Sequence, residues 1–266
     1  MLFLLSPAKS LDYETAVPAP LLGKATEPLF TAQAAELIGV LRKKSPAKVA
    51  ALMDLSDKLA ALNVARYAAW QAQATPANSK PAALAFDGDV YTGLQAPTLS
   101  TADLVWAQKH LVILSGLYGV LRPLDRLQPY RLEMGTALKT RRGKDLYAWW
   151  GDTVAQYLDQ HLAAQPRGAA RVVVNLASIE YARVALRASL QARVVDCVFE
   201  ESRAGEHKVI SFFAKKARGL MARHAVQQRA RSLAQLETFS AEGYALDRGA
   251  SQADRLVFRR PARALT

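Results

Sequence analysis

The chain has 266 residues, of which 51% are hydrophobic, so it is long enough to bury a large core in one or two domains. Its 35 Lys and Arg residues exceed its 23 Asp and Glu residues, which gives a formal net charge of +12. This excess predicts attraction to polyanions such as nucleic acid, anionic lipid or phosphorylated substrates. Ordinary solubilising charge is the alternative interpretation.

Composition also excludes several classes of protein. The single cysteine, Cys197, makes an internal disulfide and a cysteine-based zinc or iron–sulfur site impossible. The apolar run Leu2–Leu5 is too short for the core of a signal peptide and has no basic lead-in. No stretch approaches the roughly 20 apolar residues that a membrane span needs. We therefore expect a cytoplasmic protein with no membrane partner.

Strands are predicted at short apolar runs rich in Val, Ile, Leu and Phe and flanked by turn residues. In chain order these runs are Leu2–Leu5, Ala82–Phe86, Leu111–Leu114, Val172–Leu176, Val194–Phe199, Val209–Phe213 and Leu256–Phe258. Helical patterns lie between them, including Pro28–Lys44 and the apolar stripe of Asp145–Leu162. This alternation predicts an α/β fold with mixed α+β character, in which residues 1–266 form a single domain around a mixed sheet.

Residues 46–70 predict two helices joined by a tight turn. Pro46 suits a first helical position, and Ser56 or Asp57 can cap the second helix. The layout resembles a helix-hairpin-helix, in which N–H groups at the start of the second helix face a nucleic-acid phosphate. Lys58 and Arg66 would add charge, but the usual hairpin glycines are absent and Asp57 would repel phosphate. A helical hairpin that only packs is therefore the alternative.

Polar residues follow four of the predicted strands. In open α/β sheets, ligand sites gather beyond the carboxyl ends of strands, so these loops are candidates for one shared site. Ordinary turn chemistry is the alternative, because Gly and Asp are common after strands. The four loops are Ser6–Asp12, Asp87–Leu94, Ser115–Asp125 and Asn175–Tyr181.

Two further segments are rich in basic residues. Between residues 115 and 144, Arg122 and Arg131 suit phosphate or carboxylate, or pair with Asp125 and Glu133 within the fold. The bases at 139–144 are left unexplained by that pairing. The second segment, 212–224, predicts a helix with one apolar stripe and a basic face. Such a face suits a phosphate backbone, an anionic membrane surface or plain solvation.

Several motifs are missing. The chain has no phosphate-binding glycine loop and no serine nucleophile elbow, and its four histidines are scattered without a metal-type pairing. Asp125 and Glu180 remain as candidates for a general acid or base. Tyr91 and Tyr118 can stack on a base or pack half-buried at strand ends.

These segments resemble the motifs of the bacterial YaaA family, in family order from residue 1 to about 260. The matching motifs include Ser6–Lys9, Ser56–Ala60, Gly88–Leu94, Ser115–Asp125, Pro129–Gly135, Gly143–Tyr147, Asn175–Ser178, Ala214–Met221 and Glu242–Tyr244. The resemblance implies a cytosolic protein that protects bacteria during hydrogen peroxide stress, with lower free intracellular iron. It also implies binding of double-stranded DNA, a helix-hairpin-helix and a positively charged cleft. It implies no reaction.

We therefore expect a protein that binds double-stranded DNA without sequence preference. The phosphate contacts are expected from Lys58, Arg66, Lys215, Lys216, Arg218 and Arg223. The cleft is expected to be lined by Lys9, Tyr91, Tyr118, Arg122, Arg131, Lys144 and Ser178.

The alternative function is an enzyme acting on a nucleobase or nucleotide in the same cleft, with Asp125 or Glu180 as acid or base. A small nucleobase-like molecule is then a second expected partner. No cofactor and no metal are expected. Direct iron sequestration is disfavoured because the surplus of positive charge repels a cation, and because thiolate sets and histidine pairs are missing.

Overall fold

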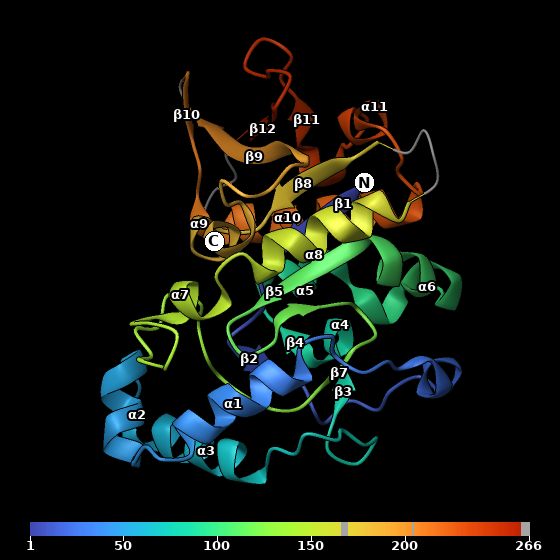
Figure 1. Cartoon of the computed structure of the whole chain (residues 1–266). Helices are drawn as coiled ribbons and strands as arrows, with labels where there is room; N and C mark the ends of the chain where they lie inside the picture. Colours follow the sequence, from blue (N-terminus) through green and yellow to red (C-terminus); the bar gives the residue numbers. More distant parts are fainter. Residues whose placement is uncertain (166–169, 204, 262–266) are drawn as a thin grey trace.

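The computed structural model describes residues 1–165, 170–203 and 205–261, and its centre is a mixed sheet (Figure 1). Eight strands form this sheet in the order β11–β12–β9–β8–β1–β5–β6, with β10 paired to β9. Their bounds are β1 Leu2–Leu5, β5 Leu111–Ser115, β6 Gly119–Leu121, β8 Val172–Leu176, β9 Arg193–Arg203, β10 Glu206–Lys208, β11 Ala245–Leu246 and β12 Arg255–Pro261. The predicted α/β class is confirmed.

Strand β1 lies between β8 and β5 in a run of five adjacent parallel strands, β12, β9, β8, β1 and β5. All four of its residues, Leu2–Leu5, are buried, which suits a strand covered on both faces. From β1 the chain goes to β5 on one side, crosses to β8 on the other, and continues outward to β9 and β12. The direction of winding therefore reverses between β1 and β8.

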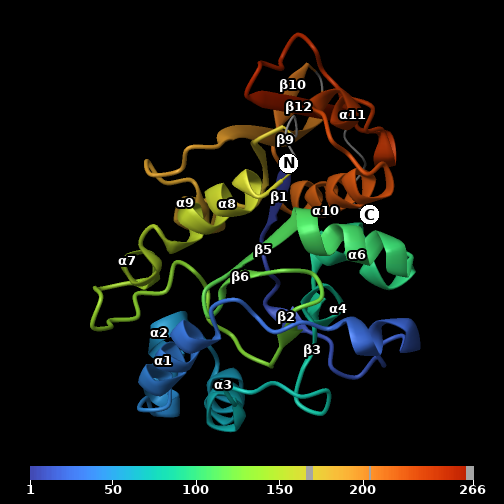
Figure 2. The same ribbon diagram turned by 45° about the vertical axis from the view of Figure 1, so that its right-hand side comes forward.

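Helices cover both faces of the sheet, as Figure 2 shows from the side. On one side of β1 and β5 lie α8 (Thr153–Ala163) and α9 (Ile179–Ala185). On the other side lie α6 (Thr101–His110) and α10 (Ser211–Gln227), and the short helix α11 (Leu233–Glu237) follows. None of the helices in the described ranges is long and apolar enough to cross a membrane.

A second group of elements lies beyond the carboxyl end of β1, in the lower part of Figure 1. Its helices are α1 Thr31–Leu41, α2 Pro46–Met53, α3 Asp57–Ala69, α4 Ala82–Ala85, α5 Asp89–Leu94 and α7 Leu146–Trp150. Two small sheets, β2 (Ser10–Leu11) with β4 (Phe86–Asp87) and β3 (Lys80–Pro81) with β7 (Arg126–Leu127), connect them. The 3₁₀ helices are η1 Ala19–Lys24, η2 Ala96–Thr98 and η3 Ala241–Gly243. One continuous cluster of buried hydrophobic residues joins this group to the sheet.

Five of the seven predicted strands are confirmed, and two are wrong. Residues 82–85 form helix α4, and helix α10 begins at Ser211 within the predicted strand Val209–Phe213. A short apolar run is compatible with a buried helix as well as with a strand, so periodicity could not separate them. The single helix predicted over Asp145–Leu162 is divided at Gly151, whose φ of 49° ends α7 before α8 begins.

Helices α5 and α10 cross at two glycines. A Cβ added to Gly219 would overlap the carbonyl oxygen of Val90, and one added to Gly93 would overlap the carbonyl oxygen of Lys216. Only glycine allows the two backbones to approach so closely. The crossing fixes the position of α10 relative to the loop that starts α5, and this position shapes the site described next.

Candidate functional site

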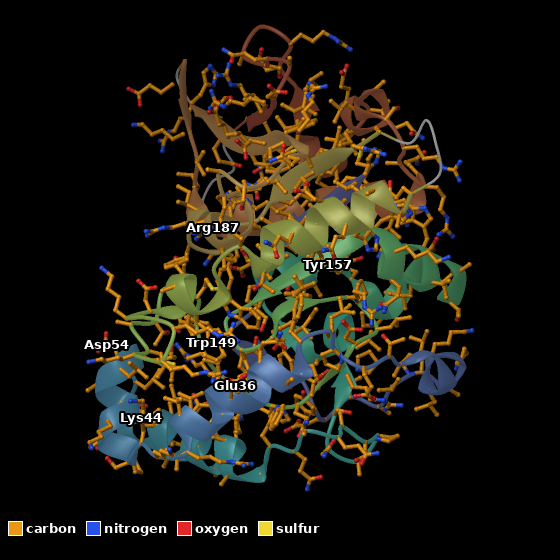
Figure 3. All side chains as sticks on the ribbon, viewed as in Figure 1. Glu36, Lys44, Asp54, Trp149, Tyr157 and Arg187 are labelled. Atoms are coloured by element: carbon orange, nitrogen blue, oxygen red, sulfur yellow. The ribbon has the colours of Figure 1, made fainter. Side chains whose placement is uncertain are left out.

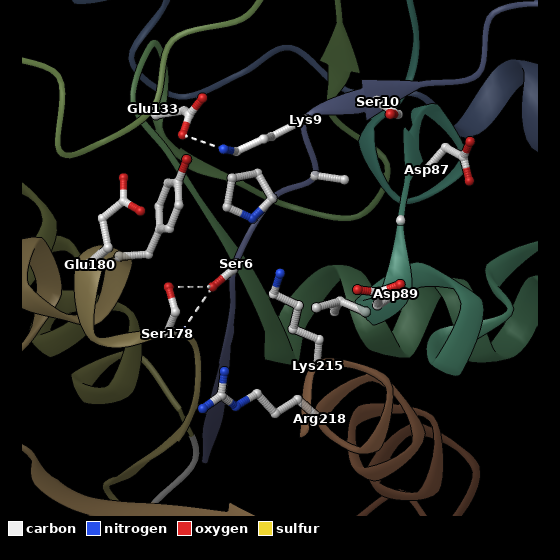
Figure 4. A pocket seen from close by; sticks show the side chains of 15 residues that line it. Ser6, Lys9, Ser10, Asp87, Asp89, Glu133, Ser178, Glu180, Lys215 and Arg218 are labelled. Carbon is white, nitrogen blue, oxygen red and sulfur yellow. Dashed lines mark hydrogen bonds and ion pairs between the residues drawn. The ribbon is translucent and has the colours of Figure 1, made fainter. Parts of the chain in front are cut away.

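A pocket of about 290 Å³ lies at the carboxyl ends of β1 and β8, where the winding of the sheet reverses (Figure 4). Open α/β sheets form their ligand crevices at such points. The pocket combines the loops after β1, β4 and β8 with one face of α10. Its lining residues are Ser6, Pro7, Ala8, Lys9, Ser10, Asp87, Gly88, Asp89, Val90, Glu133, Ser178, Glu180, Tyr181, Lys215 and Arg218.

Hydrogen bonds between the strand ends fix the floor of the pocket. The N–H of Ser178 donates to Ser6 Oγ at 2.9 Å, and Ser6 Oγ donates to Ser178 Oγ at 3.3 Å. The buried hydroxyl of Tyr91, on α5, donates to the carbonyl of Ser6 at 3.1 Å. Since Ser178 Oγ accepts from Ser6, its own proton is left for a ligand.

One wall of the pocket is acidic. Glu133 lies between two cations, with Lys9 Nζ at 2.9 Å and Arg131 Nη2 at 2.9 Å, so both of its oxygens are engaged. Glu180 Oε1 accepts the N–H of Gly135 at 2.8 Å. Its second oxygen has no hydrogen bond from any described residue. Glu180 is therefore the carboxylate of this wall that has an acceptor to offer.

The opposite wall is cationic and comes from α10. Lys215 and Arg218 lie one helical turn apart and point toward the Ser6–Ser178 floor in Figure 4. Neither makes a hydrogen bond or ion pair with a described residue. Burial lowers the pKa of the half-buried Arg218 guanidinium, an effect that the charge of Asp196 partly offsets. An arginine stays protonated in proteins, so its charge is better stabilised when an anion joins it.

A second pocket adjoins the first, because Asp87 lines both. It is lined by Leu11, Asp12, Tyr13, Glu14, Arg66, Asp87 and Pro129. Together the two pockets present six carboxylates and four basic side chains. The lining of these two pockets therefore has mixed charge, which differs from the positively charged cleft that the family resemblance implied.

The predicted cleft residues divide into two groups. Lys9, Ser178 and Glu180 line the first pocket, together with the predicted phosphate ligands Lys215 and Arg218. The Tyr91 hydroxyl donates to the Ser6 carbonyl in the floor of the pocket, and Arg131 forms an ion pair with Glu133 in its acidic wall. Three of the four predicted loops thus meet at this pocket, whereas the loop Ser115–Asp125 contributes no residue to its lining.

The remaining predicted residues lie elsewhere. Asp125 is fully buried, and its carboxylate accepts from the Thr26 hydroxyl at 2.6 Å and from the Arg122 backbone at 2.7 Å. Burial raises the pKa of Asp125, and the Arg122 guanidinium opposes that shift. Tyr118 is buried and accepts from the Trp70 indole at 2.8 Å. Asp125, Arg122 and Tyr118 therefore line neither of the two pockets, and each makes contacts inside the fold.

The basic face predicted for α10 is turned toward the protein. Lys216 pairs with Glu242 at 2.5 Å. Arg223 donates to the carbonyls of Leu94 and Gln95, each at 3.1 Å. These two side chains were expected to contact DNA phosphates, and the structure instead uses them to attach α10 to its neighbours.

Exposed cations gather on a different surface, formed by helices α1–α3 and the loop 139–144. Arg141 joins the two parts through an ion pair with Glu36 at 2.6 Å, and Arg142 stacks 4.3 Å above the Trp149 ring. Figures 1 and 3 show the loop beside α2. We call this the hairpin surface, and its exposed basic residues are Arg42, Lys43, Lys48, Lys58, Lys139, Arg141, Arg142 and Lys144.

Serine side chains cap the N-termini of α2 and α3, and the sequence predicted the one at Ser56. Ser45 Oγ accepts the N–H of Lys48, and Ser56 Oγ accepts the N–H of Leu59. Asp54 takes a left-handed conformation with φ 52° and ends α2, in place of the glycine that was missing from the hairpin. The two predicted helices are thus confirmed.

The sequence suggested Asp89 as a partner of Glu180, and both line this pocket. It did not single out Ser6, Asp87 or Glu133 as site residues, although all three stand in polar segments that it described. No group of three or more potential metal ligands of the His, Cys, Asp or Glu type occurs in residues 1–165, 170–203 and 205–261. Burial raises the pKa of the Cys197 thiol to about 12, which keeps it protonated and unreactive.

Fold and site together define an α/β protein with a mixed-charge pocket at the reversal of its sheet and a separate basic hairpin surface. A family model described as peroxide stress protein YaaA matches residues 1–250. The chain is 65% identical to a UPF0246 protein of Leptothrix cholodnii over 260 residues, and 60% identical to one of Polaromonas naphthalenivorans, covering 98% of each chain in both comparisons. The chain belongs to the YaaA family of peroxide stress proteins.

Proposed function

We propose that this protein acts in peroxide stress by binding double-stranded DNA without sequence preference through the hairpin surface. The peroxide role follows from the family to which the chain belongs. The observation that supports DNA binding is the joining of two basic segments, 43–58 and 139–144, through the Arg141–Glu36 ion pair. The segments are far apart in the sequence, yet their exposed cations share one surface.

The charges of the hairpin surface suit a phosphate backbone. The ammonium groups of Lys43, Lys48, Lys58, Lys139 and Lys144 have no hydrogen bond or ion pair with a described residue, so they are available to an anion. The N-terminus of α3 adds the partial positive charge of its first N–H groups. Asp54 and Asp57 oppose this attraction. None of these groups reads base edges, so the expected binding has little sequence preference.

The salt dependence of duplex binding tests the proposal. Each phosphate contact that is lost should reduce the slope of log affinity against log salt by about 0.9. The variant with Lys48, Lys58 and Lys144 all changed to Gln should therefore lose up to about three units of slope in fluorescence anisotropy with a short duplex.

The matched control changes three exposed cations on other elements, Lys24, Lys109 and Arg171, to Gln. It removes the same net charge and should leave the slope within one contact of the wild-type value. Equal losses in both variants, or no wild-type binding at low salt, would overturn the proposal.

The resemblance to this family also implies lowered free intracellular iron. We propose that this effect does not require iron binding by the chain, because its positive charge repels a cation and its sequence has no thiolate set. Anaerobic calorimetric titration with Fe²⁺ should show no saturable binding. Tight binding would contradict this part and leave the DNA experiment unaffected.

A further inference from the structure

We propose that the pocket between β1, β8 and α10 binds one nucleotide unit. Its phosphate lies between Lys215, Arg218 and the Ser178 hydroxyl, and the amino group of its base lies at Glu180. This inference goes beyond the proposed DNA contacts, since it concerns a different site. The ligand has two sources, a free nucleoside monophosphate or a nucleotide turned out of a DNA strand.

The position of the pocket supports a ligand site independently of its side chains. The chain leaves β1 toward β5 and returns to β8 on the opposite side, so the loops after β1 and β8 separate and leave a crevice between them. Ser6 and Ser178 are the residues that follow these strands, and they are hydrogen-bonded to each other across the crevice.

The cationic wall identifies the anionic part of the ligand. Arg218 is half-buried and has no hydrogen-bonding partner among the described residues, although its guanidinium has five N–H donors. Lys215 lies on the same face of α10 as Arg218. Opposite them, the Ser178 hydroxyl accepts from Ser6 and can donate its own hydrogen to a ligand. A phosphate offers the oxygens that such a set of donors requires.

The acidic wall identifies the other end of the ligand. Glu133 is neutralised by Lys9 and Arg131, but Glu180 retains an acceptor oxygen. A carboxylate of this kind pairs with an N–H donor, and the exocyclic amino groups of adenine, cytosine and guanine are such donors. Pro7, Val90 and the Tyr181 ring supply apolar surface for the base between the two walls. A volume of about 290 Å³ is near the lower end for ligand pockets and suits one small ligand.

Calorimetric titration of the full chain with nucleotides tests the assignment. AMP and CMP should bind saturably, whereas UMP, which has no exocyclic amino group, should bind about tenfold more weakly. Adenosine and inorganic phosphate, which each offer one end of the ligand, should also bind at least about tenfold more weakly than AMP.

Two variants connect the binding to the proposed contacts. Arg218→Gln should weaken the binding of AMP by about tenfold or more and leave the binding of adenosine unchanged. Arg218→Lys should recover part of the lost AMP affinity. Glu180→Gln keeps an acceptor for the Gly135 N–H and should reduce the preference for AMP over UMP. Lys24→Gln, on η1, is the control and should change nothing. Thermal unfolding of each variant establishes that it is folded, and Lys215→Ala provides a second test on an exposed residue.

A duplex with one unpaired adenosine distinguishes the two sources. If the nucleotide belongs to a DNA strand, this duplex should bind more tightly than a fully paired one, and Arg218→Gln should abolish the difference. The inference would be overturned if neither AMP nor the bulged duplex bound in a manner that depends on Arg218. Failure of the DNA proposal is separate, because the Lys48, Lys58 and Lys144 variant should lose duplex affinity while it still binds AMP.

Discussion

Lysines and arginines on α10 and on the hairpin surface meet different surroundings. On α10, Lys216 pairs with Glu242, Arg223 donates to backbone carbonyls, and Arg218 is half-buried in the pocket. On the hairpin surface, Lys48 and Lys58 are exposed and unpaired. Lys216 and Arg223 are thus held by contacts within the fold. Arg218 faces only the small pocket, whereas Lys48 and Lys58 are open to a large polyanion.

The difference shows that a basic stretch of sequence does not by itself locate a nucleic-acid interface. The mixed charge of the pocket favours a small ligand with two kinds of polar group, since a duplex would place its phosphates near Asp87 and Asp89 as well as near Lys215. The exposed lysines of the hairpin surface outnumber its carboxylates, which favours contacts spread along a backbone.

The largest expected effect comes from breaking the α5–α10 crossing that positions the cationic wall. Gly219→Ala places a methyl group against the Val90 carbonyl and should lower the free energy of unfolding by about 3 kcal/mol or more. A Cβ added to Gly39, in helix α1 of the hairpin surface, would have no neighbouring atom within 4 Å. Gly39→Ala should therefore raise the free energy of unfolding by about 0.5–1 kcal/mol. Urea denaturation measures both, and equal effects would contradict the close approach.

An intermediate effect is expected from an ion pair beside the second pocket. Lys80 is buried, and its ammonium contacts the Asp12 carbonyl at 2.9 Å and carboxylate at 3.0 Å. Asp12→Asn should lower the free energy of unfolding by about 2 kcal/mol at neutral pH, because a buried ammonium loses its countercharge.

The same variant should change the response to acid. The Thr15 N–H, aided by Lys80, holds the pKa of Asp12 far below its usual value of about 4. A lowered pKa in the folded state contributes stability above the unfolded-state pKa, and this contribution is lost as the pH falls through about 4 and below. Urea denaturation from neutral pH to about pH 3 should therefore be less pH-dependent in Asp12→Asn than in the wild type. Identical pH dependence would show that Asp12 is not responsible.

The smallest effect is expected from a cation that is already paired. Lys216→Gln removes an ion pair at the surface and should lower the free energy of unfolding by less than about 1 kcal/mol. It should leave the salt slope of duplex binding unchanged, whereas Lys58→Gln should reduce that slope by about 0.9. A loss of slope in Lys216→Gln would move part of the DNA interface to α10.

The sequence predicted the strands that occupy the centre of the sheet because both faces of these strands are buried. Leu2–Leu5 and Val172–Leu176 have the bounds that their apolar runs indicated. The run at 82–86 failed because its surroundings, and not its composition, decide between helix and strand. Backbone N–H groups of Ala82 and Ala83 donate to the carbonyls of Asp125 and Pro123, which lie 43 and 40 positions further along the chain, and no local pattern contains such contacts.

The sequence likewise predicted only part of the candidate site. The rule that ligands lie beyond carboxyl ends of strands brought Lys9, Ser178 and Glu180 together correctly. The partner of each cation was not predictable, because it depends on the tertiary fold. Lys216 meets Glu242, 26 positions further along the chain, and Arg141 meets Glu36, which precedes it by more than 100 positions.

The position of β1 between β5 and β8 has a consequence for folding during synthesis. Its first partner, β5, begins at residue 111, and its second, β8, begins at residue 172. During synthesis, the apolar segment Leu2–Leu5 leaves the ribosome long before either neighbour exists, so it stays unpaired at least until β5 has been translated. We expect this segment to be a main target for chaperones on the nascent chain, and the central sheet to close only after β8 has emerged.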